Sequence, residues 1–140
     1  DKTGWTPLFM TTTAGSQPRR ALALRCLIAL GADVTAKDES QQPLFTWASW
    51  QGADVQILHL LAQHGASVNA RDKRAWTPLH YAAGTRKIAT VTMFLDEFDA
   101  DASTCDTFGY CPLQRAGDLR KNGPEVHAIL AAGAAVKFTV

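Results

Sequence analysis

Apolar residues recur at helical spacing along this chain, and polar turns separate the segments that carry them. Four stripes have the spacing that places their side chains on one face of a helix. They are formed by Leu24, Leu27 and Ile28; by Ile57, Leu58 and Leu61; by Ile88, Val91 and Leu95; and by Val126, Ile129 and Leu130. Each stripe predicts an amphipathic helix with one buried face.

A shorter helix is predicted ahead of each stripe, where a Pro-Leu pair recurs. The pairs begin at Pro7, Pro43, Pro78 and Pro112, at spacings of 36, 35 and 34 residues. Thr77, just before the third pair, is a good N-cap residue, and proline suits the first helical position because its missing N–H costs nothing there. Helices this short are marginal alone, so each must be stabilised by packing against its neighbours.

A second marker keeps step with the Pro-Leu pairs. The segments GADV (31–34), GASV (65–68), DADA (99–102) and GAAV (133–136) follow the four stripes. A fixed period with matched internal markers indicates a solenoid of stacked repeats. We place the repeats at 1–37, 38–71, 72–105 and 106–140.

The third repeat carries the clearest motif, TPLHYAA at 77–83, preceded by GASVNARD at 65–72. This motif resembles the ankyrin repeat, whose period is about 33 residues. The resemblance covers all four repeats and implies an all-α solenoid of paired antiparallel helices with projecting β-hairpin-like loops. It implies a single ankyrin repeat domain over 1–140, which we expect to be part of a longer chain.

The second repeat departs from the pattern. The segment from Asp38 to Pro43 is one residue shorter than its counterpart in the third repeat, Gln42 replaces the capping threonine, and the turn glycine is missing. We therefore expect a flattened or shifted hairpin. Aligned on the Pro-Leu pair, Trp47 falls where the family has alanine.

The end of the third repeat also lacks the expected glycine. The segment there reads DEFDADAS, with Asp99 at the turn. Because a residue other than glycine is strained at positive φ, we expect an irregular turn near Phe98 and Asp99.

The resemblance implies a module that binds a partner protein or peptide on its concave face, without enzymatic activity. In the family, hairpin tips and the exposed side of the first helices hold partners. Mapped onto this chain, the tip positions are Lys2, Thr3, Trp5, Ser40, Gln41, Lys73, Arg74, Trp76, Thr107, Phe108 and Tyr110, and the helix positions are Thr13, Ser49, Trp50, Thr85, Arg86 and Asp118.

Aromatic residues occupy one hairpin position in three repeats, namely Trp5, Trp76 and Tyr110. Either this row accepts a partner, since aromatic side chains are enriched at binding hot spots, or each ring packs on the next hairpin. We favour packing for these rings. Trp50 has no evident core role and is the better candidate for binding.

Other reactive side chains have structural explanations. In the family, the histidine at the position of His80 bonds within and between repeats, so we assign it no catalytic role. Cys105 and Cys111 lack Cys-x-x-Cys or zinc-finger spacing. Asn69 resembles the asparagine that is hydroxylated in many ankyrin repeats, although a bond across the hairpin is enough to explain it.

Composition narrows the classes of partner. The 140 residues are 46% hydrophobic and carry a net charge of +1, which gives no global field for nucleic acid. No apolar run approaches the roughly 20 residues of a membrane span, and three cysteines indicate a reducing compartment. The acidic segment 96–101 lacks calcium-loop spacing. We expect no cofactor, no metal and no membrane insertion.

Two functions remain open. The first is a monomeric intracellular scaffold or adaptor that binds another protein. The second is a regulatory or targeting module within a larger multidomain enzyme or microbial effector, which would place the chain in a host cytoplasm.

Overall fold

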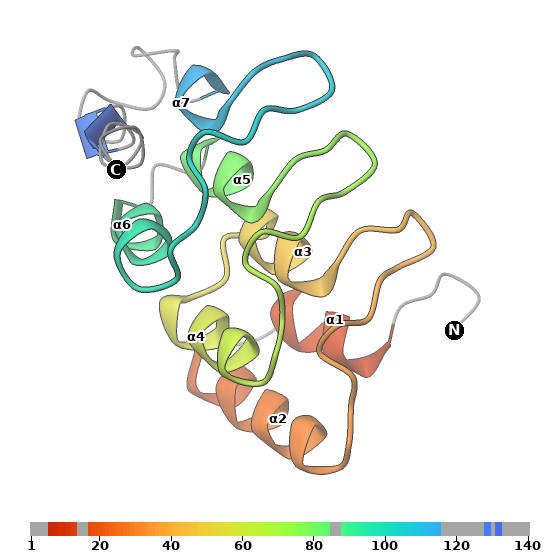
Figure 1. Cartoon of the computed structure of the whole chain (residues 1–140). Coiled ribbons are helices and arrows are strands. Elements are labelled where there is room, and N and C mark those ends of the chain that lie inside the picture. Colours follow the sequence, from red (N-terminus) through yellow and green to blue (C-terminus); the bar gives the residue numbers. More distant parts are fainter. Residues whose placement is uncertain (1–5, 14–16, 85–87, 116–127, 130, 133–140) are drawn as a thin grey trace.

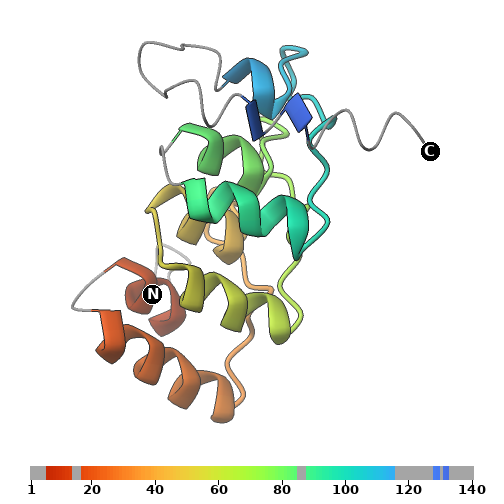
Figure 2. The ribbon, with the colours of Figure 1, turned by 90° about the vertical axis from the view of Figure 1, so that its left-hand side faces the viewer.

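The chain is a stack of helix pairs, seen in a computed structural model that describes residues 6–13, 17–84, 88–115, 128–129 and 131–132. The first helices of the repeats form one row beside the projecting loops, and the second helices form another (Figure 1). Figure 2 shows the second row stacked in sequence order. The helices are α1 (Pro7–Thr13), α2 (Gln17–Ala29), α3 (Leu44–Trp50), α4 (Val55–Gln63), α5 (Pro78–Gly84), α6 (Ile88–Asp96) and α7 (Pro112–Arg115).

Each helix packs on the equivalent helix of the next repeat. α1, α3, α5 and α7 contact one another in that order, as do α2, α4 and α6. Their buried faces form one continuous core, in which Phe9, Phe45, Phe94 and several leucines are almost completely inaccessible. No strand occurs in the described segments, where an isolated bridge joins Lys37 to Pro43. The predicted all-α solenoid is therefore confirmed.

The loops before α3, α5 and α7 close with one hydrogen-bond pattern, which begins at an aspartate. The N–H groups of Asp38, Asp72 and Asp106 donate to the carbonyl oxygens of Gln42, Trp76 and Tyr110, at 3.1, 3.1 and 2.9 Å. One carboxylate oxygen of each aspartate also accepts from the N–H of the same residue four positions on, at 2.9 to 3.0 Å. The turn aspartates lie 34 residues apart, and this spacing defines the register of the repeats.

The prediction of a flattened or shifted hairpin in repeat two is wrong. Gln41 adopts φ 61° at the register position where Ala75 has φ 59° and Gly109 has φ 82°, so the turn forms without glycine. No residue is missing from this loop. Instead Pro43 takes the N-cap position with an extended ψ of 144°, and α3 begins one residue later, at Leu44.

This register moves two residues from their expected positions. Trp47 aligns with Tyr81 and not with an alanine. Ser49 aligns with Ala83 and is only 2% exposed, and its hydroxyl donates to the Phe45 carbonyl oxygen at 2.8 Å. The expectation that Ser49 lies on the exposed side of the helix is therefore wrong.

The turn after α6 is irregular, as predicted. Asp99 has φ 50°, and the Ala100 N–H reaches back six residues to the Phe94 carbonyl at 2.8 Å. After α4, the Ala66 N–H reaches back only five residues. This wider turn shifts α6 by one residue, so Thr90, Val91, Met93 and Phe94 form its buried face, while Ile88, expected in the core, is 37% exposed.

Candidate functional site

A groove of about 910 Å³ is formed by the loops and first helices of repeats two and three, together with Arg115 of α7 in repeat four. We call it the inner groove. Its walls combine aromatic rings with three cationic side chains and one aspartate. It is lined by Ser40, Gln42, Trp50, Asp72, Lys73, Arg74, Trp76, His80, Tyr81, Gly84 and Arg115.

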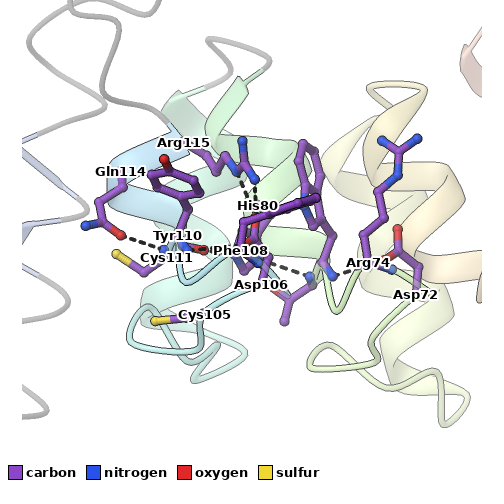
Figure 3. A network of polar contacts seen from close by, with 12 residues as sticks. Asp72, Arg74, His80, Cys105, Asp106, Phe108, Tyr110, Cys111, Gln114 and Arg115 are labelled. Carbon is purple, nitrogen blue, oxygen red and sulfur yellow. Dashed lines mark hydrogen bonds and ion pairs between the residues drawn. The ribbon is translucent and has the colours of Figure 1, made fainter.

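Asp106 does not line the groove but bonds two residues that do, Trp76 and Arg115. Figure 3 shows the polar network around its carboxylate. Its Oδ1 accepts the backbone N–H groups of Phe108 and Tyr110 at 2.9 and 3.0 Å. Its Oδ2 accepts the Trp76 indole N–H at 3.0 Å and is also bonded by the Arg115 guanidinium, whose Nε lies at 2.8 Å. One carboxylate therefore joins a loop, a ring and a helix.

These contacts fix the ionisation of Asp106. Burial by itself raises the pKa of this carboxyl, because it disfavours the charged form. The hydrogen bonds from Tyr110, Arg115 and Phe108, together with the charge of Arg115, outweigh burial and lower the pKa of Asp106 to about 2. At neutral pH the aspartate is therefore an anion with its acceptor sites occupied.

Trp76 is held on several sides. Besides the bond of its N–H group to Asp106, the Arg115 guanidinium carbon lies 5.0 Å from the ring centroid. His80 stacks on the indole at 5.9 Å and Tyr81 contacts it at 4.8 Å. These contacts agree with the packing interpretation of this ring.

His80 uses both ring nitrogens in the fold. Nδ1 lies 3.1 Å from the Thr77 backbone nitrogen, which is the donor of that bond, and 2.9 Å from the Thr77 hydroxyl. Nδ1 must therefore be the acceptor, so Nε2 carries the proton and donates to the Tyr110 carbonyl at 3.1 Å. Burial lowers the pKa of His80, which favours this neutral form. The predicted bonding within and between repeats is confirmed.

Tyr81 and Arg115 occupy the same register position and serve equivalent aspartates. The Tyr81 hydroxyl donates to Asp72 Oδ2 at 2.6 Å, as Arg115 donates to Asp106 Oδ2. Burial, together with this hydrogen bond, raises the pKa of Tyr81. Both carboxylate oxygens of Asp72 are therefore bonded, since Oδ1 accepts the backbone N–H groups of Arg74 and Trp76.

Trp50 is the open aromatic side chain of the groove. It is 51% exposed, and its ring meets the Trp47 ring edge to face at 4.9 Å. Its register counterpart in repeat three is Gly84, and no described atom lies within 4 Å of the position that a Cβ of residue 84 would take. One face of the groove therefore has a large ring beside open space.

The structure brings together part of the predicted set of binding residues. Ser40, Trp50, Lys73, Arg74 and Trp76 line the inner groove. Four others, namely Gln41, Thr107, Phe108 and Tyr110, are exposed on loops without lining it. Positions outside the described residues are Lys2, Thr3, Trp5, Thr85, Arg86 and Asp118, and the side chain of Thr13 is likewise not described.

Several groove residues escaped the sequence prediction. They are Gln42, Asp72, His80, Tyr81, Gly84 and Arg115. The sequence held a signal for Tyr81 and Arg115. Together with Trp47 they are spaced by 34 residues, and each lies nine positions after a turn aspartate. Counting from the aspartates rather than from the prolines would have aligned them.

Asn69 bonds between repeats rather than within one hairpin. Its side-chain oxygen accepts the Asp101 N–H at 3.1 Å, while the residue itself is exposed. Its hydroxylation stays a prediction. Cys26, Cys105 and Cys111 are free thiols.

Within the described part of the chain, no three side chains of the metal-binding types gather closely enough to hold an ion. Nor does it contain a helix with the length and apolar character that crossing a membrane requires.

Comparisons with known proteins agree with this architecture. The model of the family described as Ankyrin repeats (3 copies) matches residues 45–138. Alpha-latrocrustotoxin-Lt1a of Latrodectus tredecimguttatus is 35% identical over 98 residues, which cover 70% of this chain and 7% of that protein. An ankyrin repeat protein of Fowlpox virus is 49% identical over 47 residues, covering 34% of this chain and 9% of the viral protein.

A human protein is similar over a longer segment than the viral protein. The Homo sapiens ankyrin repeat, SAM and basic leucine zipper domain-containing protein 1 is 34% identical over 83 residues, which cover 57% of this chain and 17% of that protein. This chain thus spans less than a fifth of each of the three relatives. The family match extends over more than half of the chain and coincides with the stacked helix pairs. The chain therefore belongs to the ankyrin repeat family.

Proposed function

We propose that this chain binds a partner protein or peptide in the inner groove. Ankyrin repeats generally serve as protein–protein interaction modules. The observation that carries the proposal is Trp50, a large ring that is 51% exposed at the edge of a groove of about 910 Å³. Exposed aromatic residues in such a setting are typical anchors of binding energy.

Three other lining residues of the inner groove are preorganised. Trp76, Tyr81 and Arg115 are each fixed by a bond to a turn aspartate. A surface whose side chains are already ordered loses little conformational entropy when a partner binds. Binding in the groove would therefore require little further ordering of these three side chains.

Peptide selection with a blocked groove tests the proposal. Random dodecapeptides displayed on phage would be selected on the wild-type chain, and the dissociation constants of the selected peptides measured. In Gly84→Trp the new ring enters open space, so we expect the fold to persist and affinity to fall by at least about tenfold, as for loss of a hot spot. Trp50→Ala should weaken the binding of the same peptides.

A matched substitution lies away from the groove. Leu30→Ala truncates a side chain that is 84% exposed beyond the end of α2 and should leave affinity unchanged. Urea unfolding of every variant checks that folding is retained. Equal affinity of the wild type and folded Gly84→Trp for all selected peptides would show that the groove is not the binding site.

A second candidate function is that of a regulatory or targeting module within a longer protein. It is favoured by the relatives, since this chain spans only 7% to 17% of their length. The human relative combines, by its name, ankyrin repeats with a SAM domain and a basic leucine zipper. We assign no catalytic role to the groove, because both ring nitrogens of its histidine, His80, are engaged in the fold.

A further inference from the structure

We infer that the partner of the inner groove is an acidic segment of extended chain with one large apolar side chain. This inference rests on the proposed function and names the chemistry of its partner. The apolar side chain would lie over Gly84 beside Trp50, with its neighbouring carboxylates facing Lys73 and Arg74.

The acidic group of the groove is already used by the fold. Asp72 accepts the N–H groups of Arg74 and Trp76 at 2.8 and 3.0 Å, and it accepts the hydroxyl of Tyr81 at 2.6 Å. The cation of Arg115 is likewise used, because it is bonded to buried Asp106. The fold therefore already supplies hydrogen-bond partners to both of these charged groups.

Two cations in the groove have no such use. Lys73 and Arg74 are exposed, and their side chains make no hydrogen bond or ion pair within the described part of the chain. Figure 3 shows the Arg74 guanidinium turned away from the Asp106 network. Glu39, the register counterpart of Lys73 one repeat earlier, is exposed but does not line the groove. The charge left for a partner is therefore positive.

The apolar part of the site lines the same groove as these cations. Trp50 supplies an exposed ring, and the absence of a side chain at Gly84 leaves space beside it. A large apolar side chain placed there would bury area against the ring, whereas a small one would leave the space empty. The groove thus selects for size as well as for charge.

These features favour an acidic polypeptide over a nucleic acid. Strong nucleic-acid binding uses many cations along the phosphate backbone, and the groove offers two uncommitted ones on a chain whose net charge is only +1. Two cations beside an apolar slot match a short acidic motif with one anchor. Complementary charge of this kind mainly sets specificity and association rate.

The composition of the selected dodecapeptides tests the inference. We expect Asp and Glu to be enriched within a few positions of a Trp, Phe, Leu or Met. The double variant Lys73→Glu, Arg74→Glu should bind these peptides on the order of tenfold more weakly, and binding by the wild type should weaken as salt rises. Arg19→Glu, Arg25→Glu is the matched control, since it reverses two exposed charges on α2.

The outcomes separate the inference from the proposed function. Peptides that lose affinity in Gly84→Trp but carry no acidic enrichment would overturn the inference and leave the groove as the binding site. Loss of affinity in the α2 variant equal to that in the groove variant would also overturn it. So would displacement of the peptides by a thymidine dodecanucleotide, which would indicate a nucleic-acid site. If no selected peptide depends on Gly84, the proposed function itself fails.

Discussion

At the scale of single residues, Asp106 joins several groups from different parts of the fold. It is 6% exposed, yet it ends as a charged group because two backbone N–H groups, an indole N–H and a guanidinium surround it. Buried carboxylates are tolerated only when their acceptor sites are occupied in this way. Trp76 depends on the same carboxylate, so one side chain fixes the ring and one end of the groove.

The ionisation of Asp106 predicts how stability depends on pH. Its folded pKa of about 2 lies below the ordinary aspartate value of about 3.9. The stabilisation is therefore fully present above about pH 4 and is lost as pH falls through 2. We expect Asp106→Asn to be less stable than the wild type by a constant amount between about pH 5 and 7, with the difference shrinking below about pH 4.

Urea unfolding at several pH values measures this difference. Asp96→Asn is the matched control, because the Asp96 carboxylate is exposed at the end of α6 and makes no hydrogen bond to any described residue. A difference between the wild type and Asp106→Asn that stays unchanged down to pH 2 would contradict the assigned ionisation.

At the scale of elements, the loops before α3, α5 and α7 share one conformation despite different residues at the strained position. Gln41 and Ala75 adopt the left-handed region that Gly109 adopts without strain. The turn aspartate explains this tolerance, since its carboxylate and its backbone N–H fix the residue four positions on in each loop. Hydrogen bonding compensates for an unfavourable backbone angle.

Glycine substitution at these turns should stabilise the chain. Relief of left-handed strain exceeds the added entropy of the unfolded chain, so we expect Gln41→Gly and Ala75→Gly each to raise the free energy of unfolding by about 0.5–1 kcal/mol. Gly109→Ala should lower it by about 1 kcal/mol. Urea unfolding at equilibrium measures all three changes.

A glycine outside this conformation provides the control. Gly84 ends α5 and does not have a left-handed φ, so Gly84→Ala should raise stability by about 0.5–1 kcal/mol through helix propensity. Stabilisation by Gly109→Ala would show that the turn angle is not what limits these loops.

At the scale of the whole molecule, rings link each repeat to the next. The ring centroid of Trp47 in α3 lies 6.3 Å from that of Phe9 in repeat one. In the other direction, the ring centroid of Phe45 in α3 lies 5.6 Å from that of Phe94 and 6.3 Å from that of Phe98, both in repeat three. Because a repeat contacts only its neighbours, weakening one such link reduces the coupling between the parts of the stack on its two sides.

Phe45 tests this coupling. We expect Phe45→Ala to lower the free energy of unfolding by about 3–5 kcal/mol, the usual cost of deleting a buried phenylalanine side chain. It should also split a single unfolding transition into two. Tryptophan fluorescence and far-UV circular dichroism, followed together in urea, would then give different midpoints.

An exposed ring serves as the comparison. Phe108 is 73% exposed on its loop, so Phe108→Ala should change stability by no more than about 0.5 kcal/mol. Coincident transitions for Phe45→Ala, at any loss of stability, would argue against coupling through this interface.

Local patterns predicted most of the architecture, and one of them misled in detail. The helix pairs, the turns at Gly31 and Gly65 and the irregular turn at Asp99 all follow from residues close together in sequence. The register of repeat two did not, because Pro43 lies at the N-cap rather than at the first helical position. A proline is compatible with both positions, and only the loop hydrogen bonds distinguish them.

The candidate site was predictable where it depends on position along a repeat. Lys73, Arg74 and Trp50 were expected to be exposed on the basis of the family pattern, and they are. The roles of Tyr81 and Arg115 were not foreseen, because each depends on an aspartate in the preceding loop and on the stacking of neighbouring repeats.

The sequence by itself determined the solenoid, since short helices with recurring caps and apolar stripes can bury their faces only by stacking. The sequence also favoured Trp50 over Trp76 as the tryptophan open to a partner, but only the tertiary structure decided what holds Trp76 and what leaves Trp50 open. Trp76 is engaged because the next repeat brings Asp106 and Arg115 to its indole, across at least 30 residues of chain. Trp50 remains half exposed because its register counterpart in the next repeat is Gly84. No local pattern contains the cause of that difference, because it arises from what the adjacent repeat places beside each ring.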